Sequence, residues 1–211
     1  MSGTSGPGHP RTSIFAGLYD PVIEPLERLG LGGLRRETLR GLSGDVLELG
    51  IGTGRSLGAY PVSVASVTGI DPDKAMLARA ARRLPEVMEA ETRTRLLPAA
   101  AEDLPFPDES FDAVTAFLTL CTVQSQEAAL LEARRVLAPG GELRLLEHVR
   151  LAREPLGRLQ EGLTPLWSRV AGGCQLDRRT LGGVKEAGFE VERVERYLGA
   201  LVLRIQARRA P

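Results

Sequence analysis

Residues 46–56 read VLELGIGTGRS, an aliphatic run ending in an acid and followed by three alternating glycines. Glycines at this spacing remove side chains from a turn, so that a ligand can lie directly against the backbone. They can also serve only to shape a strand-to-helix turn. The alternation of Gly50, Gly52 and Gly54 after Glu48 favours ligand binding, with the carboxylate as an acceptor for a cationic or hydroxyl-bearing group.

The spacing of these glycines excludes two common nucleotide sites. A dinucleotide turn reads G-x-G-x-x-G, but the last position is Arg55 when counted from Gly50 and Leu57 when counted from Gly52. A P-loop needs a G-K-[ST] sequence after the turn, and none follows. The turn therefore predicts a ligand that need not carry phosphate.

The chain after Gly44 alternates short aliphatic runs with helical segments, which is typical of βαβ units and a parallel sheet. Seven runs are predicted strands: DVLELG, SVTGID, TRLLPA, FDAVTAFL, GELRLLEHV, FEVERVERY and LVLRIQAR. Helices are predicted over residues 72–84, 126–137 and about 178–187, the last ended by Gly188 in a left-handed cap. The predicted fold class is α/β, a Rossmann-like seven-stranded sheet with helices on both faces.

The N-terminal region differs in composition from the rest. Residues 1–10, MSGTSGPGHP, are small and polar and predict a disordered tail. Over residues 11–42, apolar positions recur at helical intervals that Pro21 and the glycines at 30, 32 and 33 interrupt, so two or three short helices are expected. We interpret 11–211 as one domain, with 11–42 a helical lid and 44–211 the core.

The second predicted strand ends in Asp71, about 20 residues after Gly52, where Rossmann-type sheets place the acceptor for a ribose hydroxyl. Asp71 could instead cap a helix beginning at Pro72, and both roles could coexist on its two oxygens. A ligand with a ribose, no phosphate and an amino-acid end near the turn fits S-adenosylmethionine.

With these motifs the sequence resembles the class I S-adenosylmethionine-dependent methyltransferases, through VLELGIGTG, GIDPDKAML, AAAEDLPFPDESFDAV and EARRVLAPGGELRLLEHV. Within them it is similar to the alkyl thiol methyltransferase-like proteins, neighbours of the quinone-biosynthesis type. That similarity lies in FLTLCTV, the pair Glu147 and His148, and TPLWSRVAGGCQLDRRTLGGVKEAGFEV. The animal proteins begin with a hydrophobic membrane anchor, where this chain has a polar tail.

The resemblance implies a set of cofactor-binding residues. They are Tyr19, Glu48, Gly50, Gly52, Gly54, Asp71, Pro72, Ala101, Glu102 and Thr119. Many relatives carry an aspartate where this chain has Ala100, so adenine recognition is expected from the amides of Ala101 and Glu102 and from the Glu102 carboxylate. A surface-turn role for Glu102 and Asp103 before Pro105 is the alternative. Tyr19 and Asp20, in the lid, are expected near the cofactor.

Methyl transfer from a sulfonium is a direct displacement, so no covalent nucleophile is required and positioning dominates. Cys121 and Cys174 are expected to be packing residues. Glu147 and His148 end a predicted strand, where acceptor contacts are expected. His148 is expected either to contact the acceptor and act as a base, or to have only a structural role.

The expected acceptor is a small molecule with a thiol, or a phenolic or quinol oxygen. Alternatives are a lipid amine or quinone carbon methyltransferase, a non-catalytic S-adenosylmethionine-binding protein, and an enzyme acting on protein or nucleic acid. The last would show an N-P-P-Y-like tetrad where this chain reads LTLCTV.

Composition further narrows the functional classes to which the protein can belong. Lysine plus arginine and aspartate plus glutamate both total 27, so no basic excess points to nucleic acid. The two cysteines lack metal-ligand spacing, and neither a metal site nor a disulfide framework is indicated. No apolar run reaches the roughly 20 residues of a membrane span. These features predict a soluble cytoplasmic protein without integral membrane association.

Overall fold

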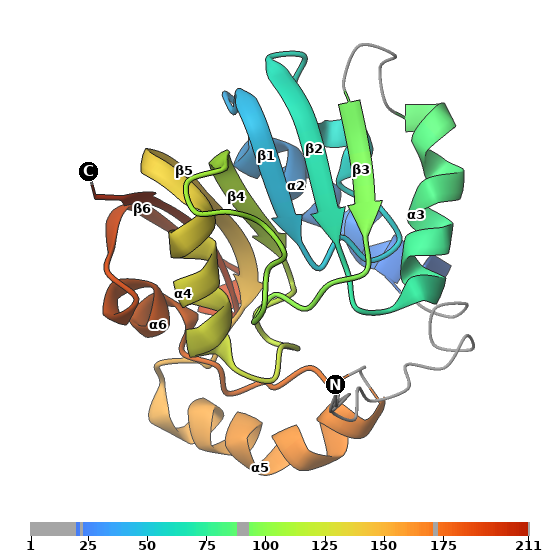
Figure 1. Cartoon of the computed structure of the whole chain (residues 1–211). Helices are drawn as coiled ribbons and strands as arrows, with labels where there is room; N and C mark the ends of the chain where they lie inside the picture. The colour runs from blue at the N-terminus through green and yellow to red at the C-terminus, as the bar shows by residue number, and fades with distance from the viewer. Residues whose placement is uncertain (1–19, 22, 88–92, 171–172, 211) are drawn as a thin grey trace, which may run out of the picture.

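The computed structural model describes residues 20–21, 23–87, 93–170 and 173–210 (Figure 1). The predicted tail over residues 1–10 and the predicted cofactor contact of Tyr19 lie outside the described residues.

All seven predicted strands are present in one sheet of order β3-β2-β1-β4-β5-β7-β6. Their bounds are β1 Gly44–Leu49, β2 Val64–Ile70, β3 Arg93–Leu97, β4 Phe111–Phe117, β5 Leu137–His148, β6 Phe189–Tyr197 and β7 Val202–Arg209. The seven-stranded Rossmann-like fold is therefore confirmed. The expectation of a parallel sheet holds for β1 to β5.

Strand β7 departs from that expectation, because it runs antiparallel to both β5 and β6. Only the short 3-10 turn η3, Leu198–Ala200, connects β6 to β7. A parallel pair needs a crossover of a dozen or more residues. Because the connection is this short, β6 and β7 must pair antiparallel.

The longer helices pack around this sheet. They are α2 Gly32–Leu39, α3 Lys74–Val87, α4 Gln126–Val136, α5 Glu154–Val170 and α6 Thr180–Glu186. Helices α3, α4 and α6 match the three predicted segments, and Gly188 follows α6 with a φ of 83°, as the left-handed cap requires. Helix α5 was not predicted, since Gly157, Gly162 and Pro165 interrupt a segment whose leucines nevertheless recur at helical spacing.

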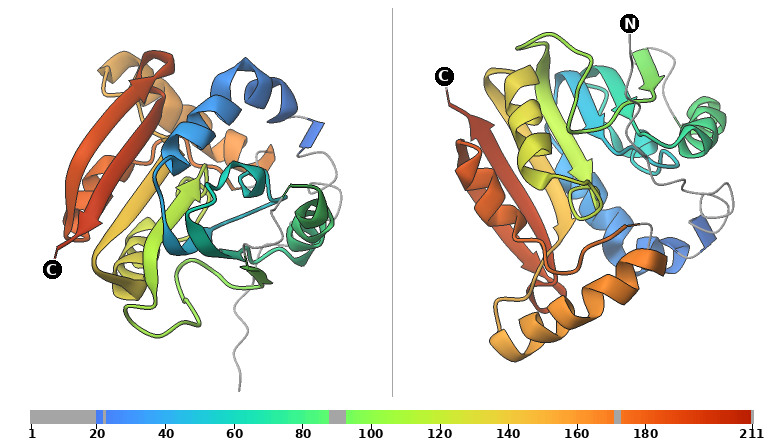
Figure 2. Two further views of the ribbon diagram at one scale, coloured as in Figure 1. Left: turned by 90° about the horizontal axis from the view of Figure 1, so that it is seen from above. Right: turned by 60° about the horizontal axis from the view of Figure 1, so that its bottom comes forward.

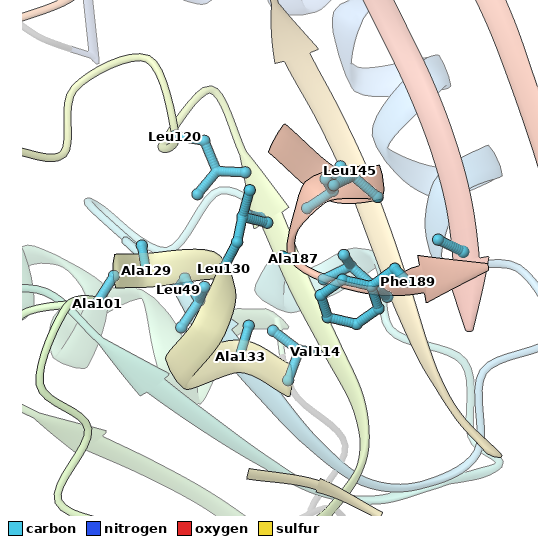
Figure 3. Close-up of a cluster of buried hydrophobic side chains, with 14 of the residues drawn as sticks. Leu49, Ala101, Val114, Leu120, Ala129, Leu130, Ala133, Leu145, Ala187 and Phe189 are labelled. Carbon is cyan, nitrogen blue, oxygen red and sulfur yellow. The ribbon is translucent and has the colours of Figure 1, made fainter. Parts of the chain in front are cut away.

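Helices lie on both faces of the sheet (Figure 2). A separate apolar cluster lies between the sheet and the helices on each face. One cluster joins the sheet to α4 and α6, through residues such as Leu130, Ala133 and Val184. Figure 3 shows Leu130 and Ala133 of this cluster. The other joins it to α2 and α3, through Leu39 and Ala80 among others. Neighbouring residues of a strand face opposite sides, so one run of aliphatic residues supplies both clusters.

The N-terminal helices divide at Gly30, whose φ of 136° bends the short π-helical turn η1, Glu27–Leu31. The glycines at 32 and 33 do not interrupt a helix as predicted, because both lie inside α2. Leu39 at the end of α2 is fully buried, and Arg144 of β5 donates to the Thr38 carbonyl oxygen at 3.3 Å. Helix α2 is therefore packed against the sheet through its buried residues Arg35, Thr38 and Leu39.

Candidate cofactor and acceptor site

The carboxyl ends of four strands meet at one edge of the sheet. Leu49 at the end of β1 pairs with Ile70 of β2 and with Ala116 of β4, and Phe117 of β4 pairs with Leu146 of β5. The segments that follow these strand ends therefore lie together, as expected of a ligand site in an open α/β sheet.

The three glycines of the turn have different roles. A β-carbon on Gly50 would come within 2.4 Å of the Thr119 side chain, and one on Gly54 within 3.0 Å of Ala80 in α3. Among described atoms, a β-carbon on Gly52 would meet nothing nearer than the Gly50 carbonyl oxygen at 3.9 Å. Gly50 and Gly54 thus allow close packing, whereas Gly52 leaves a free space beside the backbone, which we call the Gly52 hollow.

Asp71 ties the glycine turn to the end of β2. Its Oδ2 accepts a hydrogen bond from the Gly52 amide at 3.1 Å, and its Oδ1 accepts one from the Asp73 amide at 2.8 Å. Helix α3 begins after Pro72, and Asp73 accepts from the Ala75 amide in its first turn. The capping role considered for Asp71 therefore falls to Asp73, and both Asp71 oxygens, rather than one, accept backbone bonds.

Glu48 points into the protein beneath the turn. Its carboxylate accepts hydrogen bonds from the Ser56 hydroxyl at 2.6 Å and the Tyr60 hydroxyl at 2.8 Å. Burial raises the pKa of Glu48 to about 7, although these bonds and the charge of Arg35 oppose the rise. Glu48 fixes the shape of the turn, and its direct contact with a ligand stays a prediction.

The loop after β3 carries the residues expected at the adenine. Ala101 is buried, while the Glu102 carboxylate accepts from the amides of Gln124 at 2.7 Å and Ser125 at 3.3 Å. Glu102 thus joins this loop to the start of α4. The exposed Asp103 donates its amide to the Ala100 carbonyl oxygen, which fits the turn considered for this segment.

Glu147 holds the loop after β4. Leu118 has a φ of 55°, a left-handed conformation uncommon outside glycine, and this reversal brings the following amides back toward β5. The amides of Thr119 and Leu120 donate to Glu147 Oε1 at 2.9 and 3.0 Å. The Thr119 hydroxyl donates to the Leu49 carbonyl oxygen at 3.1 Å, which connects this loop to β1.

Glu147 and His148 differ in their surroundings. Glu147 is fully buried, burial raises its pKa to about 7, and no described residue gives its Oε2 a hydrogen bond. His148 is half-buried, and its Nδ1 is likewise without a partner among the residues that the structure describes. Burial lowers the pKa of His148, so the neutral imidazole predominates near pH 7.

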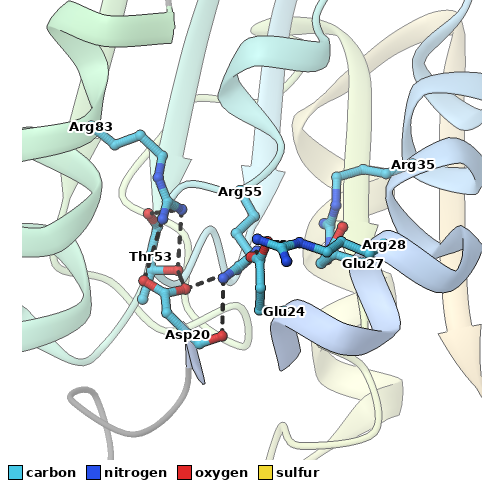
Figure 4. A network of polar contacts seen from close by, with 8 residues as sticks. All are labelled: Asp20, Glu24, Glu27, Arg28, Arg35, Thr53, Arg55 and Arg83. Atoms are coloured by element: carbon cyan, nitrogen blue, oxygen red, sulfur yellow. Dashed lines mark hydrogen bonds and ion pairs between the residues drawn. The ribbon is translucent and has the colours of Figure 1, made fainter. Parts of the chain in front are cut away.

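Asp20 fastens the helical segment before α2, residues 20–21 and 23–31, to the glycine turn (Figure 4). We call this segment the N-terminal helix. Its Oδ1 accepts from the Thr53 hydroxyl at 2.7 Å and from Arg55 Nε at 2.8 Å, and its Oδ2 lies 3.3 Å from Arg83 of α3. Burial opposes ionisation, but these hydrogen bonds and the Arg83 charge lower the pKa of Asp20. We call this set of contacts the Asp20 latch; sequence analysis placed Asp20 near the cofactor but missed its partners.

The structure brings together two cysteines that sequence analysis treated as separate packing residues. The sulfur atoms of Cys121, after β4, and Cys174, after α5, lie 3.7 Å apart. Spacing alone gave no signal, because 53 residues separate them.

The described part of the chain holds no group of three or more histidine, cysteine or acidic side chains that could bind a metal ion. None of its described helices has the length and apolar character of a membrane span.

Comparisons with known proteins bear on the family and the fold of the chain. Residues 47–145 match the family model described as a methyltransferase domain. The chain is 37% identical over 165 residues to thiol S-methyltransferase TMT1B of Homo sapiens, covering 75% of this chain and 66% of that protein. It is 41% identical over 120 residues to phosphatidylethanolamine N-methyltransferase of Cereibacter sphaeroides, covering 57% and 58% respectively. The chain thus spans less than two thirds of the length of either relative.

Among solved structures, geranyl diphosphate methyltransferase in complex with S-adenosylmethionine superposes with a TM-score of 0.70 at 15% identity, covering 96% of this chain and 93% of that one. A glycine turn at the carboxyl edge of a seven-stranded Rossmann-like sheet defines the class of fold. The matched family model, the relatives and the fold together support a class I S-adenosylmethionine-dependent methyltransferase.

Proposed function

We propose that this protein binds S-adenosylmethionine at the glycine turn and methylates a small, largely apolar molecule. The observation that carries the proposal is the Gly52 hollow, a space against bare backbone beside the buried Asp71 carboxylate. A positively charged sulfonium with an amino-acid arm suits such a turn, which has neither the lysine nor the third glycine of a phosphate site.

Individual residues have distinct proposed roles toward the cofactor. Gly50, Gly52 and Gly54 form the backbone turn against which its amino-acid arm lies. Asp71, beside Pro72, accepts from a ribose hydroxyl. The amides of Ala101 and Glu102 face the adenine. Asp71 can accept this further hydrogen bond because a carboxylate has about four acceptor positions, and each backbone amide can donate one hydrogen bond.

The cofactor supplies a methyl group on a positively charged sulfur, and the protein's part is to align the acceptor with it. Glu147 is a positioning residue in this scheme, because its carboxylate is fully buried and holds the Thr119 and Leu120 amides. It thereby fixes the loop that stands next to Gly50, with Thr119 near the methyl group. The predicted direct contact of Glu147 with the acceptor is replaced by this indirect role.

His148 is the proposed group that receives a proton from the acceptor. It is half-buried at the carboxyl end of β5, and its lowered pKa keeps the ring neutral and able to accept a proton at neutral pH. The similarity to thiol S-methyltransferase TMT1B supports a thiol acceptor. A thiol has a pKa of about 8.5, so modest assistance from a base suffices.

The N-terminal helix is proposed to close over the cofactor. Helix α2 does not take part in this closure, because it is packed against the sheet. The Asp20 latch holds the N-terminal helix against Thr53, directly between Gly52 and Gly54. Closure would exclude water from the reacting groups.

A second candidate is methylation of a lipid amine, favoured by the similarity to phosphatidylethanolamine N-methyltransferase. The apolar stripe on α5 is consistent with a lipid-like acceptor, since Leu159, Leu163, Leu166 and Trp167 are exposed on this helix. An amine must lose its proton before attack, so it would depend on His148 more strongly than a thiol.

The test is product detection by mass spectrometry with S-adenosylmethionine and a panel of alkyl thiols, phenols, quinols and amines. We expect methylated thiol as the main product. Methylation of amines or quinols alone would promote those alternatives. Cofactor binding without any product would indicate a non-catalytic binder, and methylation of protein or nucleic acid alone would overturn the small-molecule proposal.

A further inference from the structure

Cys121 and Cys174 lie on two segments that are joined by their backbones. The Gln175 amide donates to the Cys121 carbonyl oxygen at 2.8 Å, and the two sulfur atoms are 3.7 Å apart. Disulfide formation requires neighbouring backbones and sulfurs that can approach to about 2 Å. The thiols of this pair need only a small further approach.

The two thiols have unequal surroundings. Cys121 is fully buried, and its contact with Cys174 together with burial raises its pKa well above the ordinary value. Cys174 is partly exposed, and hydrogen bonding to Cys121, assisted by Trp167, lowers its pKa to about 7. A reactive cysteine is an accessible thiolate, so Cys174 is the residue that meets a reagent from solution. When the Glu147 carboxylate is ionised, its charge further raises the pKa of the Cys121 thiol.

We propose that Cys121 and Cys174 are a redox pair that closes to an intramolecular disulfide when the protein meets a small-molecule disulfide. Because one thiol is accessible, the other is buried and the two are in contact, the order of the two exchange steps follows. Cys174 attacks first, and Cys121 resolves the product.

The chemistry balances in two exchanges. The Cys174 thiolate attacks one sulfur of the reagent R-S-S-R, which forms a mixed disulfide and releases one thiolate R-S⁻. The Cys121 thiol then loses its proton to solvent or to the released thiolate and attacks the Cys174 sulfur, releasing the second R-S⁻. The protein loses two electrons and two protons, and the reagent is reduced to two thiols.

The new bond would tie the segment after α5 to the loop that carries Thr119. It would also remove the contact of the Cys121 thiol with the Leu118 carbonyl oxygen, 3.4 Å away. The glycine turn contacts this loop through the Thr119 hydroxyl, but the new bond does not cross the turn itself. Oxidation should therefore restrict the acceptor side while cofactor binding remains; this consequence for turnover rests on the proposed function, whereas disulfide formation does not.

The test exposes the full chain to 2-hydroxyethyl disulfide and follows intact mass and cysteine-linked peptides. We expect the wild-type protein to lose the mass of two hydrogen atoms and to yield a Cys121–Cys174 linked peptide, both reversed by a reductant. Cys121→Ala should stop at one mixed disulfide on Cys174. Cys174→Ser should remain unmodified, because Cys121 is buried.

Trp167 provides an independent readout, since it is the only tryptophan of the chain and contacts Cys174. Its fluorescence should fall on oxidation of the wild-type protein and recover on reduction, with no such change in Cys174→Ser. Wild-type protein that ends with separate adducts on both cysteines, or with none, would overturn the proposal. So would a Cys174→Ser variant that is modified at Cys121 as fast as wild type. Linked peptide without loss of turnover would refute only the functional consequence.

Discussion

The Asp71 carboxylate accepts a hydrogen bond from the Gly52 amide, 19 residues earlier in the chain, at 3.1 Å. This bond joins the ends of β1 and β2 directly beside the Gly52 hollow. A similar bond joins β1 to β4 at the opposite edge of the sheet, where Asp112 accepts from the Asp45 amide at 2.8 Å. The chain thus contains a related pair of contacts, one at the proposed cofactor site and one remote from it.

Asp71→Ala should weaken S-adenosylhomocysteine binding by on the order of 1.5 to 3 kcal/mol, the range for hydrogen bonds to a charged group. Asp112→Ala is the matched control, because it removes a carboxylate-to-amide bond between strands without touching the site. Calorimetry on both variants measures whether the loss of S-adenosylhomocysteine affinity is specific to Asp71. An equal dissociation constant for Asp71→Ala and wild type would reject the ribose role.

His148→Asn keeps some hydrogen bonding but cannot take a proton. If the acceptor is deprotonated by His148, turnover should fall by about 10² to 10⁴, the usual share of general base catalysis. The loss should shrink as the pH rises above the acceptor's own pKa. A smaller, pH-independent loss would indicate positioning alone, and wild-type rates at every pH would exclude both roles.

Asp20→Ala breaks the latch between the N-terminal helix and the glycine turn. The substitution removes the contacts of Asp20 with Thr53, Arg55 and Arg83. Cofactor should dissociate at least about tenfold faster, because a tenfold change corresponds to about 1.4 kcal/mol and a single hydrogen bond to a charged group contributes about that much or more. Glu24→Ala is the control, since Glu24 also pairs with Arg55 at 2.8 Å but is not bonded to Thr53. Stopped-flow release kinetics compare the two.

The same account predicts how truncations behave. Removal of residues 1–10 should cost little activity. Removal of residues 1–31 should weaken cofactor binding while α2 and the core remain folded, as circular dichroism would show. Intact turnover and affinity after that larger deletion would make the lid proposal wrong.

Glu147 should make stability depend on pH. Its pKa rises from 4.5 to about 7 on folding, so folding favours the protonated form. Stability is therefore greatest below the unfolded pKa, declines as the pH rises to about 7, and is level above it; this shift corresponds to roughly 3 kcal/mol. Glu147→Gln should reduce the decline in urea unfolding between pH 5 and 8, leaving the part due to Glu48. The exposed Glu190→Gln should leave it unchanged, and an unaltered decline in Glu147→Gln would contradict the assignment.

The sequence predicted the strands well because aliphatic runs bounded by glycine and acidic residues carry a strong local signal. It did not predict α5, whose two glycines and internal proline obscure the helical recurrence of its leucines. Its expectation of a parallel sheet was wrong for β7, since strand direction follows from the length of the connecting turn rather than from the strand itself.

The candidate site was also predicted only in part from the sequence. The positions of Gly52 and Asp71 follow from motif spacing along the chain, and the structure brings them together. The inward turn of Glu48 toward Ser56 and the approach of Cys121 to Cys174 depend on tertiary packing. No local pattern specifies such contacts, so sequence analysis missed them.

The central claim, that S-adenosylmethionine occupies the Gly52 hollow, is tested most directly by calorimetric titration with S-adenosylhomocysteine. Gly52→Val fills the hollow, and Gly140→Val is the matched control, because Gly140 also has a positive φ and no described atom within 4 Å of a β-carbon, but lies at the other end of β5. We predict that wild type and Gly140→Val bind S-adenosylhomocysteine alike. Gly52→Val should give no binding heat although circular dichroism shows it folded. NAD and ATP should not bind to wild type. Unchanged binding by Gly52→Val, or tighter binding of NAD than of S-adenosylhomocysteine, would contradict the account.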